Sequence, residues 1–188
     1  MTVYNWIVIA AWAVFLIVWL ASSFFTKRTA RRNMPWLGTA LRILAALIIL
    51  LFIHLGISGK IGLAFLAGAH PVLGAFGAAF TVIGIAFAVW ARAYLGRNWG
   101  MPMTVREAPE LVMTGPYAYV RHPIYTGVIL AIFGSTLASG FPWLIVFIAA
   151  SAYFAYSATK EEAHLLQEFP DAYPAYRART KMLIPFIW

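Results

Sequence analysis

The feature that most constrains this chain is a run of 23 residues, Val3 to Phe25, that contains no charged side chain. A helix rises 1.5 Å per residue, so a run of this length is about 35 Å long and can cross a bilayer. The outer face of a helix in a soluble domain normally carries polar and charged residues. The run therefore predicts a transmembrane helix.

Four more apolar segments follow along the chain. They are Leu37 to Ile57, Pro71 to Leu95, Ile124 to Ala138 and Phe141 to Thr159. Composition agrees, because 63% of the residues are hydrophobic and 11% are charged, against about half and a quarter in soluble domains. We therefore predict an all-α integral membrane protein with about five transmembrane helices in one domain, 1–188. It comprises N-terminal spans, 1–95, and a more polar C-terminal region, 96–188.

The positive charges predict how the helices are oriented. If the loop after the first span is cytoplasmic, 13 of the 14 Lys and Arg residues lie on that side, and only Lys60 lies opposite. Cytoplasmic loops are enriched in Lys and Arg, so we expect the N-terminus outside and the C-terminus in the cytoplasm. The net charge of +8 is then explained by topology and anionic lipid headgroups rather than by nucleic acid.

Small residues recur at helical spacing on the third and fourth spans. They are Gly77, Gly84 and Ala88 on one and Gly127, Ala131 and Gly134 on the other. In lipid, small residues on one face let helix backbones approach closely, so this pattern predicts tight helix packing. The chain has no cysteine, which excludes disulfides, cysteine-ligated metals and thiol catalysis.

The connection from Gly96 to Pro123 is 28 residues long, and ordered loops of this length are often functional. It ends in Arg121 and His122 where the fourth span begins, and a helix start favours an anion. Gly127, one turn into the helix, lets a neighbour approach its backbone. Each residue also has a simpler explanation, such as a topology charge for Arg121 and a helix cap for His122.

Two adjacent acids, Glu161 and Glu162, stand at the end of the fifth span, although the whole chain has only six acidic residues. Glu161 and Leu165 share a helical face, whereas Glu162 points about 100° away. The two glutamates are therefore expected to have different roles. The simpler alternative is a solvated helix end that balances nearby Lys and Arg. Further on, Tyr173 and Tyr176 are spaced as on one helical turn.

Four motifs occur in a defined order: Arg-His-Pro-x-Tyr-x-Gly at 121–127, Glu-Glu-x-x-Leu at 161–165, Tyr-x-x-Tyr at 173–176 and Ile-Pro-Phe-Ile at 184–187. This set resembles the isoprenylcysteine carboxyl methyltransferases and their phospholipid methyltransferase relatives, over roughly residue 111 to the C-terminus. Each motif alone is weak, but the ordered set is specific. The first three spans match only in being transmembrane.

The resemblance implies an S-adenosylmethionine-dependent methyltransferase with its cofactor pocket at the cytoplasmic face of the C-terminal half. The implied cofactor-binding residues are Tyr117, Val120, Arg121, His122, Pro123, Tyr125, Gly127, Glu161, Glu162 and Leu165. Glu161 or Glu162 suits the ribose hydroxyls as an acceptor, and the helix start at His122 suits the cofactor's carboxylate. Aromatic faces such as Tyr117 or Tyr125 suit the sulfonium.

The methyl acceptor implied by the resemblance is lipophilic, and two kinds of acceptor fit. A carboxylate, as in a prenylcysteine, would be held by Arg179, because the family has an arginine at that spacing after the tyrosine pair. An amine, as in a phospholipid, would instead need Glu162 to stabilise or deprotonate it. Arg179 and Glu162 are thus the candidate catalytic residues. Methyl transfer is a displacement at carbon that needs positioning and desolvation, so we expect membrane lipids as partners and no metal.

Two other functions fit parts of the pattern. Sterol reductases have a similar C-terminal region and bind a nicotinamide cofactor, but the chain is short and its glutamate pair resembles the methyltransferase version. A non-catalytic lipid-binding or haem-binding membrane protein is the other alternative, with haem ligands drawn from His54, His70, His122 and His164. In every case we expect a multi-pass integral membrane protein, in the inner membrane if the source is bacterial.

Overall fold

The computed structural model describes residues 2–23, 29–32, 70–96, 104–106 and 110–185. The elements are α1 (Val3–Ser23), β1 (Thr29–Arg32), α3 (Pro71–Leu95), β2 (Thr104–Arg106), the short 3-10 helix η3 (Gly115–Ala118), α4 (Pro123–Ser139), α5 (Phe141–Glu168) and α6 (Ala172–Arg179). The predicted span from Leu37 to Ile57 lies outside the described residues.

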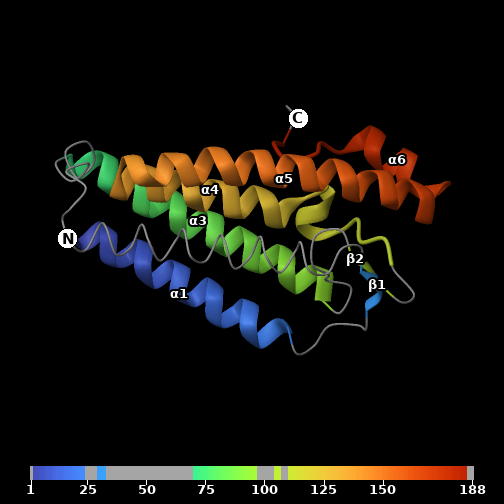
Figure 1. Cartoon of the computed structure of the whole chain (residues 1–188), viewed down its shortest axis with the longest axis horizontal. Coiled ribbons are helices and arrows are strands. Elements are labelled where there is room, and N and C mark those ends of the chain that lie inside the picture. The colour runs from blue at the N-terminus through green and yellow to red at the C-terminus, as the bar shows by residue number, and fades with distance from the viewer. Residues whose placement is uncertain (1, 24–28, 33–69, 97–103, 107–109, 186–188) are drawn as a thin grey trace.

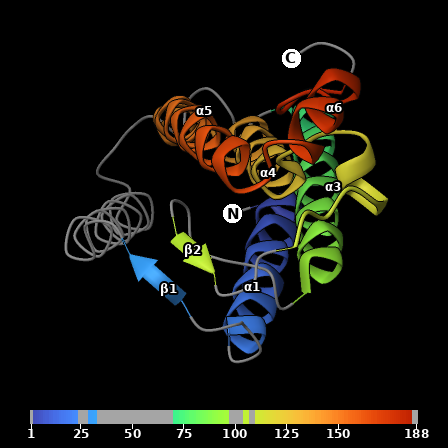
Figure 2. The same cartoon turned by 90° about the vertical axis from the view of Figure 1, so that its right-hand side faces the viewer.

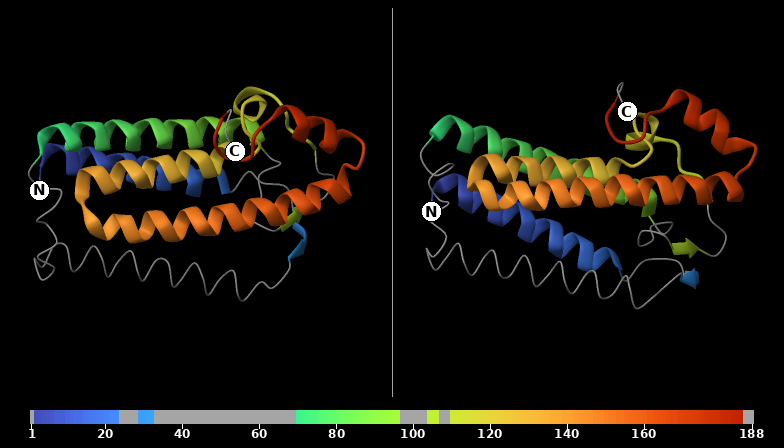
Figure 3. Two further views of the ribbon diagram at one scale, coloured as in Figure 1. Left: turned by 90° about the horizontal axis from the view of Figure 1, so that it is seen from above. Right: turned by 45° about the horizontal axis from the view of Figure 1, so that its top comes forward.

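The four long helices lie side by side in a bundle (Figure 1). Helices α1, α3 and α5 run in one direction and α4 returns in the other, so their ends meet at a common end of the bundle (Figures 1 and 3). The view along the bundle places α4 between α3 and α5 (Figure 2). Helix α6 and the strands β1 and β2 lie at the end where α4 begins.

Three helical segments are long and apolar enough to cross a membrane, namely Val3–Ser22, Pro71–Leu95 and Trp143–Glu168. Helix α4 is also apolar but has only 17 residues. Large apolar side chains point outward, with Ile17 on α1 66% exposed and Ile148 on α5 60% exposed. Apolar side chains in such positions are stable against lipid, as in an integral membrane protein.

The helix bounds largely match the predictions. Helix α3 has both predicted ends, and α4 extends one residue beyond the prediction at each end. The fifth span was predicted to end at Thr159, and helix α5 continues beyond it to Glu168, which places Glu161 and Leu165 on a helix as predicted. The extra residues include Glu, Ala, Leu and Gln, which favour helix in water as well as in lipid, and Pro170 then prevents continuation.

The two short strands depart from the all-α prediction. Strand β1 pairs antiparallel with β2, with Thr29 opposite Arg106 and Arg32 opposite Thr104. The pair joins the segment after α1 to the long connection after α3. Extended segments satisfy their backbone N–H and C=O groups by such pairing, and segments this short leave no clear periodic signal in the sequence.

Close contact between α3 and α4 confirms the predicted role of the small residues. A Cβ atom added to Gly84 would lie 2.5 Å from the backbone nitrogen of Ala131, and one added to Gly134 would lie 2.5 Å from the carbonyl oxygen of Gly77. The backbones therefore approach as closely as glycine allows.

A buried polar group ties α1 to the α3–α4 pair. The Thr81 hydroxyl donates to the carbonyl of Ala131 at 3.2 Å, and the Ser135 hydroxyl accepts from Trp12 Nε1 at 3.0 Å. Hydrogen bonds between helices in an apolar surrounding stabilise their register. The scaffold below the polar end of the bundle is therefore closely packed.

Candidate functional site

The site is built around the start of α4, which the C-terminal segment holds in place. The backbone N–H of Arg121 donates to the carbonyl of Lys181 at 2.8 Å, and that of His122 donates to Met182 at 3.1 Å. The Thr126 hydroxyl donates to the carbonyl of Leu183 at 2.6 Å. The C-terminal segment thus bonds the two backbone N–H groups that directly precede Pro123, the first residue of α4.

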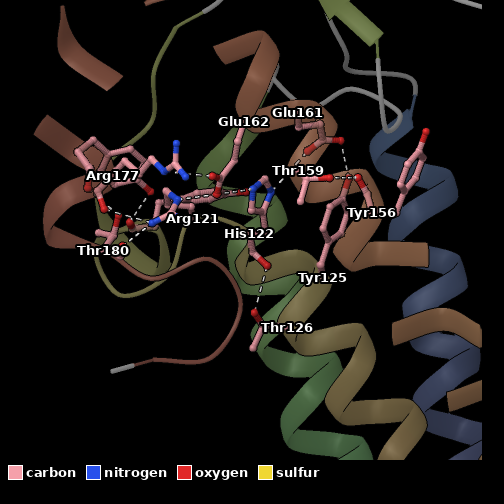
Figure 4. A network of polar contacts seen from close by, with 12 residues as sticks. Arg121, His122, Tyr125, Thr126, Tyr156, Thr159, Glu161, Glu162, Arg177 and Thr180 are labelled. Carbon is pink, nitrogen blue, oxygen red and sulfur yellow. Dashed lines mark hydrogen bonds and ion pairs between the residues drawn. The ribbon is translucent and has the colours of Figure 1, made fainter. Parts of the chain in front are cut away.

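Glu162 is the centre of one half of the cluster and is only 5% exposed. Its carboxylate lies 2.6 Å from Nε of Arg121, 3.6 Å from Nε of Arg177 and 3.5 Å from Nε2 of His122. Arg121 also donates to the backbone carbonyls of Arg177 and Thr180. Figure 4 shows these residues meeting between α5 and α6. A buried carboxylate with such partners is stabilised in its charged form.

Glu161 forms the other half and is more open, with its side chain 27% exposed. One of its oxygens accepts a hydrogen bond from the Tyr125 hydroxyl, and the other lies 3.5 Å from Nδ1 of His122. His122 therefore lies between the two glutamates, with one ring nitrogen facing each (Figure 4). The Tyr125 ring stacks on His122 at 5.4 Å and on Phe154 at 4.7 Å between centroids.

The two glutamates control the charge of His122. Burial alone would lower the pKa of this imidazole, but hydrogen bonds to Glu161 and Glu162, and their negative charges, outweigh burial and raise it above 6.5. The protonated form is favoured because each ring nitrogen lies 3.5 Å from a carboxylate oxygen. His122 thus adds positive charge to the cluster when protonated.

The other residues predicted to bind the cofactor differ in how deeply they are buried and in what they contact. Val120 and Pro123 are fully buried, and Leu165 is partly buried. Gly127 packs against α3, because a Cβ atom there would lie 2.6 Å from the carbonyl oxygen of Gly84. The neighbour that approaches Gly127 is therefore helix α3. The assignment of Gly127 to the cofactor stays a prediction. Tyr117 is buried, and its carbonyl accepts the Tyr176 hydroxyl at 2.7 Å.

Arg179 is not part of the glutamate cluster. Its guanidinium lies 5.9 Å from the Tyr176 ring centroid and contacts the sulfur of Met113 at 3.5 Å. Of the two arginines in α6, the one that faces Glu162 is Arg177, which the sequence analysis did not single out. Thr126 and Thr180 were also missed. Thr126 occupies an unspecified position of the first motif, and no pattern indicated its contact with the tail.

The described histidines have different surroundings. His70 precedes the start of α3, at the opposite end of the bundle from His122, and His164 is exposed on α5. Among the side chains that the structure describes, no three His, Cys, Asp or Glu residues are grouped to hold a metal ion. His54 lies outside the described residues.

Comparison with known proteins gives a family match and two curated relatives. The profile of the phospholipid methyltransferase family matches residues 72–172. Protein-S-isoprenylcysteine O-methyltransferase of Schizosaccharomyces pombe is 37% identical over 79 residues, covering 41% of this chain and 34% of that protein. Nickel-cobalt-cadmium resistance protein NccN of Alcaligenes xylosoxydans xylosoxydans is 33% identical over 96 residues, covering 50% of this chain and 45% of that protein. The chain thus spans about a third to under half of these relatives.

Proposed function

The chain belongs to the phospholipid methyltransferase family, and from this premise we propose that it transfers the methyl group of S-adenosylmethionine to a lipophilic acceptor. The observation that carries the proposal is the cluster in which Arg121 and His122 meet Glu161 and Glu162, because all four residues lie inside the matched segment. The resemblance found in the sequence motifs supports the same activity.

The described residues fit this cofactor. A ribose diol needs a hydrogen-bond acceptor, and the partly exposed carboxylate of Glu161 has lone pairs beyond those facing Tyr125 and His122. Glu162 is the weaker choice for the ribose, because three cationic side chains already surround it. Two protein rings pack against Tyr125, so Tyr117 is the better supported aromatic neighbour for a sulfonium.

When bound, the cofactor supplies an electrophilic methyl group. The residues of the chain then have to orient the ligands and exclude water rather than supply a strong base. His122 and Tyr125 hold Glu161 in one orientation, and Arg121 links α5 to the C-terminal segment through Glu162 and the Thr180 carbonyl. Such fixed side chains are what a positioning site needs.

A carboxylate acceptor is better supported than an amine. An amine would need a basic carboxylate, and Glu162 is held by arginines that make it a poor base. Arg179 is exposed, and its planar guanidinium suits a carboxylate. The Schizosaccharomyces pombe relative is named as an O-methyltransferase, which agrees with this choice. We therefore propose that Arg179 binds a prenylcysteine-like carboxylate.

The proposed setting is a multi-pass protein of the cytoplasmic membrane, with the N-terminus outside and the site on the cytoplasmic side. The end of the bundle that bears the site is also where Arg121, Lys160, Arg177 and Lys181 lie. Positive residues favour the cytoplasmic side, where a soluble cofactor enters. An apolar acceptor reaches the same end laterally from the bilayer.

Calorimetric titration of the detergent-purified chain tests this function. We expect S-adenosylmethionine to bind and NADPH not to bind. Glu161→Gln should weaken cofactor binding about tenfold or more, because it replaces a charged acceptor of hydrogen bonds. Glu168→Gln, an exposed change on the same helix, is the matched control. Binding of NADPH alone would indicate a reductase, and binding of neither would remove both enzymatic functions.

If the cofactor binds, the acceptor is identified with a labelled methyl group. Transfer to N-acetyl-S-farnesylcysteine is the expected result, and transfer to phosphatidylethanolamine would instead support the amine chemistry. Arg179→Gln should then raise the KM for the carboxylate acceptor and leave cofactor binding intact, whereas an unchanged KM would exclude Arg179 as its binding residue.

A further inference from the structure

Two tyrosines of α6 have different surroundings although they are three residues apart. Tyr173 is 0% exposed and Tyr176 is 3% exposed. The Tyr176 hydroxyl donates to the Tyr117 carbonyl at 2.7 Å, whereas the Tyr173 hydroxyl has no hydrogen-bond partner among the described residues. Buried hydroxyls are nearly always paired, because an unpaired one has lost its bonds to water without compensation.

The charged groups that act on Tyr173 belong to the proposed site. They are Glu162, Arg121 and Arg177. Burial, and next the charge of Glu162, raise the pKa of the Tyr173 phenol, so the hydroxyl stays protonated and can donate. The unpaired group is thus a buried hydrogen-bond donor beside the glutamate cluster.

The guanidinium of Arg177 provides further hydrogen-bond donors on the same side of α6 as Tyr173. It follows Tyr173 by four residues, which places both on one face of the helix. Its Nε lies 3.6 Å from Glu162, its side chain is 57% exposed, and its terminal nitrogens make no hydrogen bond within the described part of the chain. Two guanidinium groups, Arg121 and Arg177, therefore face the carboxylate of Glu162, and the exposed guanidinium of Arg177 can also bind an anion.

We infer that Tyr173 and Arg177 form a subsite for a carboxylate of the bound ligand, with the phenol donating one hydrogen bond and the guanidinium the others. This inference rests on the proposed function. The carboxylate belongs either to the amino-acid end of the cofactor, with Arg179 binding the acceptor, or to the methyl acceptor, with Tyr173 and Arg177 then taking the place assigned to Arg179. Both residues follow the segment matched by the family, 72–172, and the backbone N–H groups of Arg121 and His122, just before α4, are already bonded to the C-terminal segment.

Tyr173→Phe tests the subsite, with Tyr176→Phe as its matched control in the full-length, detergent-purified chain. Tyr173→Phe removes no hydrogen bond within the described structure, so the midpoint of thermal unfolding should stay within about 1 °C of wild type. Tyr176→Phe loses its bond to Tyr117 and should lower the midpoint by about 2–4 °C. For ligand binding the larger effect is expected in the other variant. Tyr173→Phe should weaken binding of the carboxylate ligand by about 10-fold to 100-fold, and Tyr176→Phe should weaken it less.

Three probes distinguish the source of the carboxylate. S-adenosylhomocysteine carries the carboxylate of the cofactor, and 5′-methylthioadenosine lacks the amino-acid end that bears it. N-acetyl-S-farnesylcysteine carries the carboxylate of an acceptor. If the cofactor supplies the group, Tyr173→Phe weakens the first probe and leaves the second unchanged. If the acceptor supplies it, both nucleosides bind normally and the KM for the farnesylated cysteine rises instead.

Two results would overturn the carboxylate subsite but not the proposed function, provided that the wild type binds S-adenosylhomocysteine. One is unchanged binding and unchanged KM for Tyr173→Phe. The other is a loss of affinity accompanied by a fall in the thermal midpoint as large as that of Tyr176→Phe, which would show a structural role. If the wild type binds no nucleoside probe and methylates no acceptor, the proposed function and the subsite fail together.

Discussion

Glu161 and Glu162 are neighbours in the chain, yet their side chains lie on different sides of α5. Successive helix positions are rotated by about 100°, so one carboxylate faces Tyr125 and the other faces Arg121 and Arg177. This rotation supports two different roles. The partly exposed Glu161 is proposed to bind the ligand, whereas the buried Glu162 links α5 to the start of α4 and to α6 through Arg121 and Arg177.

Glu162→Gln should destabilise the protein, because it leaves the buried guanidinium of Arg121 without its charged partner. The side chains of Arg121 and Glu162 are 8% and 6% exposed. Breaking a buried ion pair costs about 3 kcal/mol or more of unfolding free energy. Thermal unfolding of the detergent-solubilised protein measures this loss, with Glu168→Gln as the exposed control. Equal midpoints for the two variants would contradict the structural role of Glu162.

His122 should make stability depend on pH. Its folded-state pKa lies above 6.5, so its contribution is fully present below pH 6.5 and is lost as the pH rises through the folded-state value. We expect the difference in thermal midpoint between wild type and His122→Gln to be largest near about pH 6 and to shrink at higher pH. A difference that is independent of pH would show that the imidazole does not gain its proton on folding.

At the scale of secondary structure elements, the α3–α4 interface is the closest contact in the bundle. Gly84→Ala would bring a methyl group within 2.5 Å of α4 backbone, which cannot move without separating the helices. The expected loss is about 1–3 kcal/mol of unfolding free energy. Gly74→Ala is the matched control on the same helix, since the three atoms nearest to its methyl group belong to the side-chain ring of Tyr4 rather than to backbone. Similar thermal midpoints for both variants would argue against a rigid interface.

The contact between α4 and the C-terminal segment depends on one threonine. The hydroxyls of Thr126 and Thr136 each donate to a carbonyl four residues earlier, but only Thr126 also reaches another segment, at the Leu183 carbonyl. Thr126→Val should therefore cost about 1 kcal/mol and speed amide hydrogen exchange in residues 180–185. Thr136→Val should leave that exchange unchanged. Equal exchange in the two variants would show that the threonine does not hold the tail.

At the scale of the whole molecule, the polar cluster lies at one end of an otherwise apolar bundle. Helices α1, α3 and α5 end, and α4 begins, toward this end of the bundle, where α6 also lies (Figure 3). The proposed cofactor, which is soluble, and the proposed acceptor, which is dissolved in the membrane, can both reach such a position. The orientation of this end in the membrane then decides which compartment provides the cofactor.

Cysteine labelling tests the orientation, because the natural chain has no cysteine and each variant carries a single thiol. We expect Lys60→Cys to react with a membrane-impermeant maleimide in intact cells, and the exposed Asp171→Cys to react only after permeabilisation. Thirteen basic residues on one side are the reason for this expectation. The opposite labelling pattern would place the site outside the cell and contradict the proposed topology.

The amino-acid sequence by itself determined where most helices lie. Apolar length and flanking charge predicted α3 at both ends and α4 to within a residue, and the small residues predicted their tight contact. The ordered motifs contain Arg121, His122, Glu161 and Glu162, which meet at the cluster, whereas their assignment to a cofactor stays a prediction. These features are local, because helix formation and membrane insertion depend on residues within a few turns.

Only the tertiary structure decided which side chains face one another. The parallel bridge between Val120 and Lys181, the choice of Arg177 over Arg179 beside Glu162, and the unpaired hydroxyl of Tyr173 all depend on how α5 and α6 are rotated and shifted against α4. Hydrophobic periodicity identifies a helix face but does not specify its rotation to within one side chain. That rotation results from packing between segments about 60 residues apart in the chain, which no local pattern encodes.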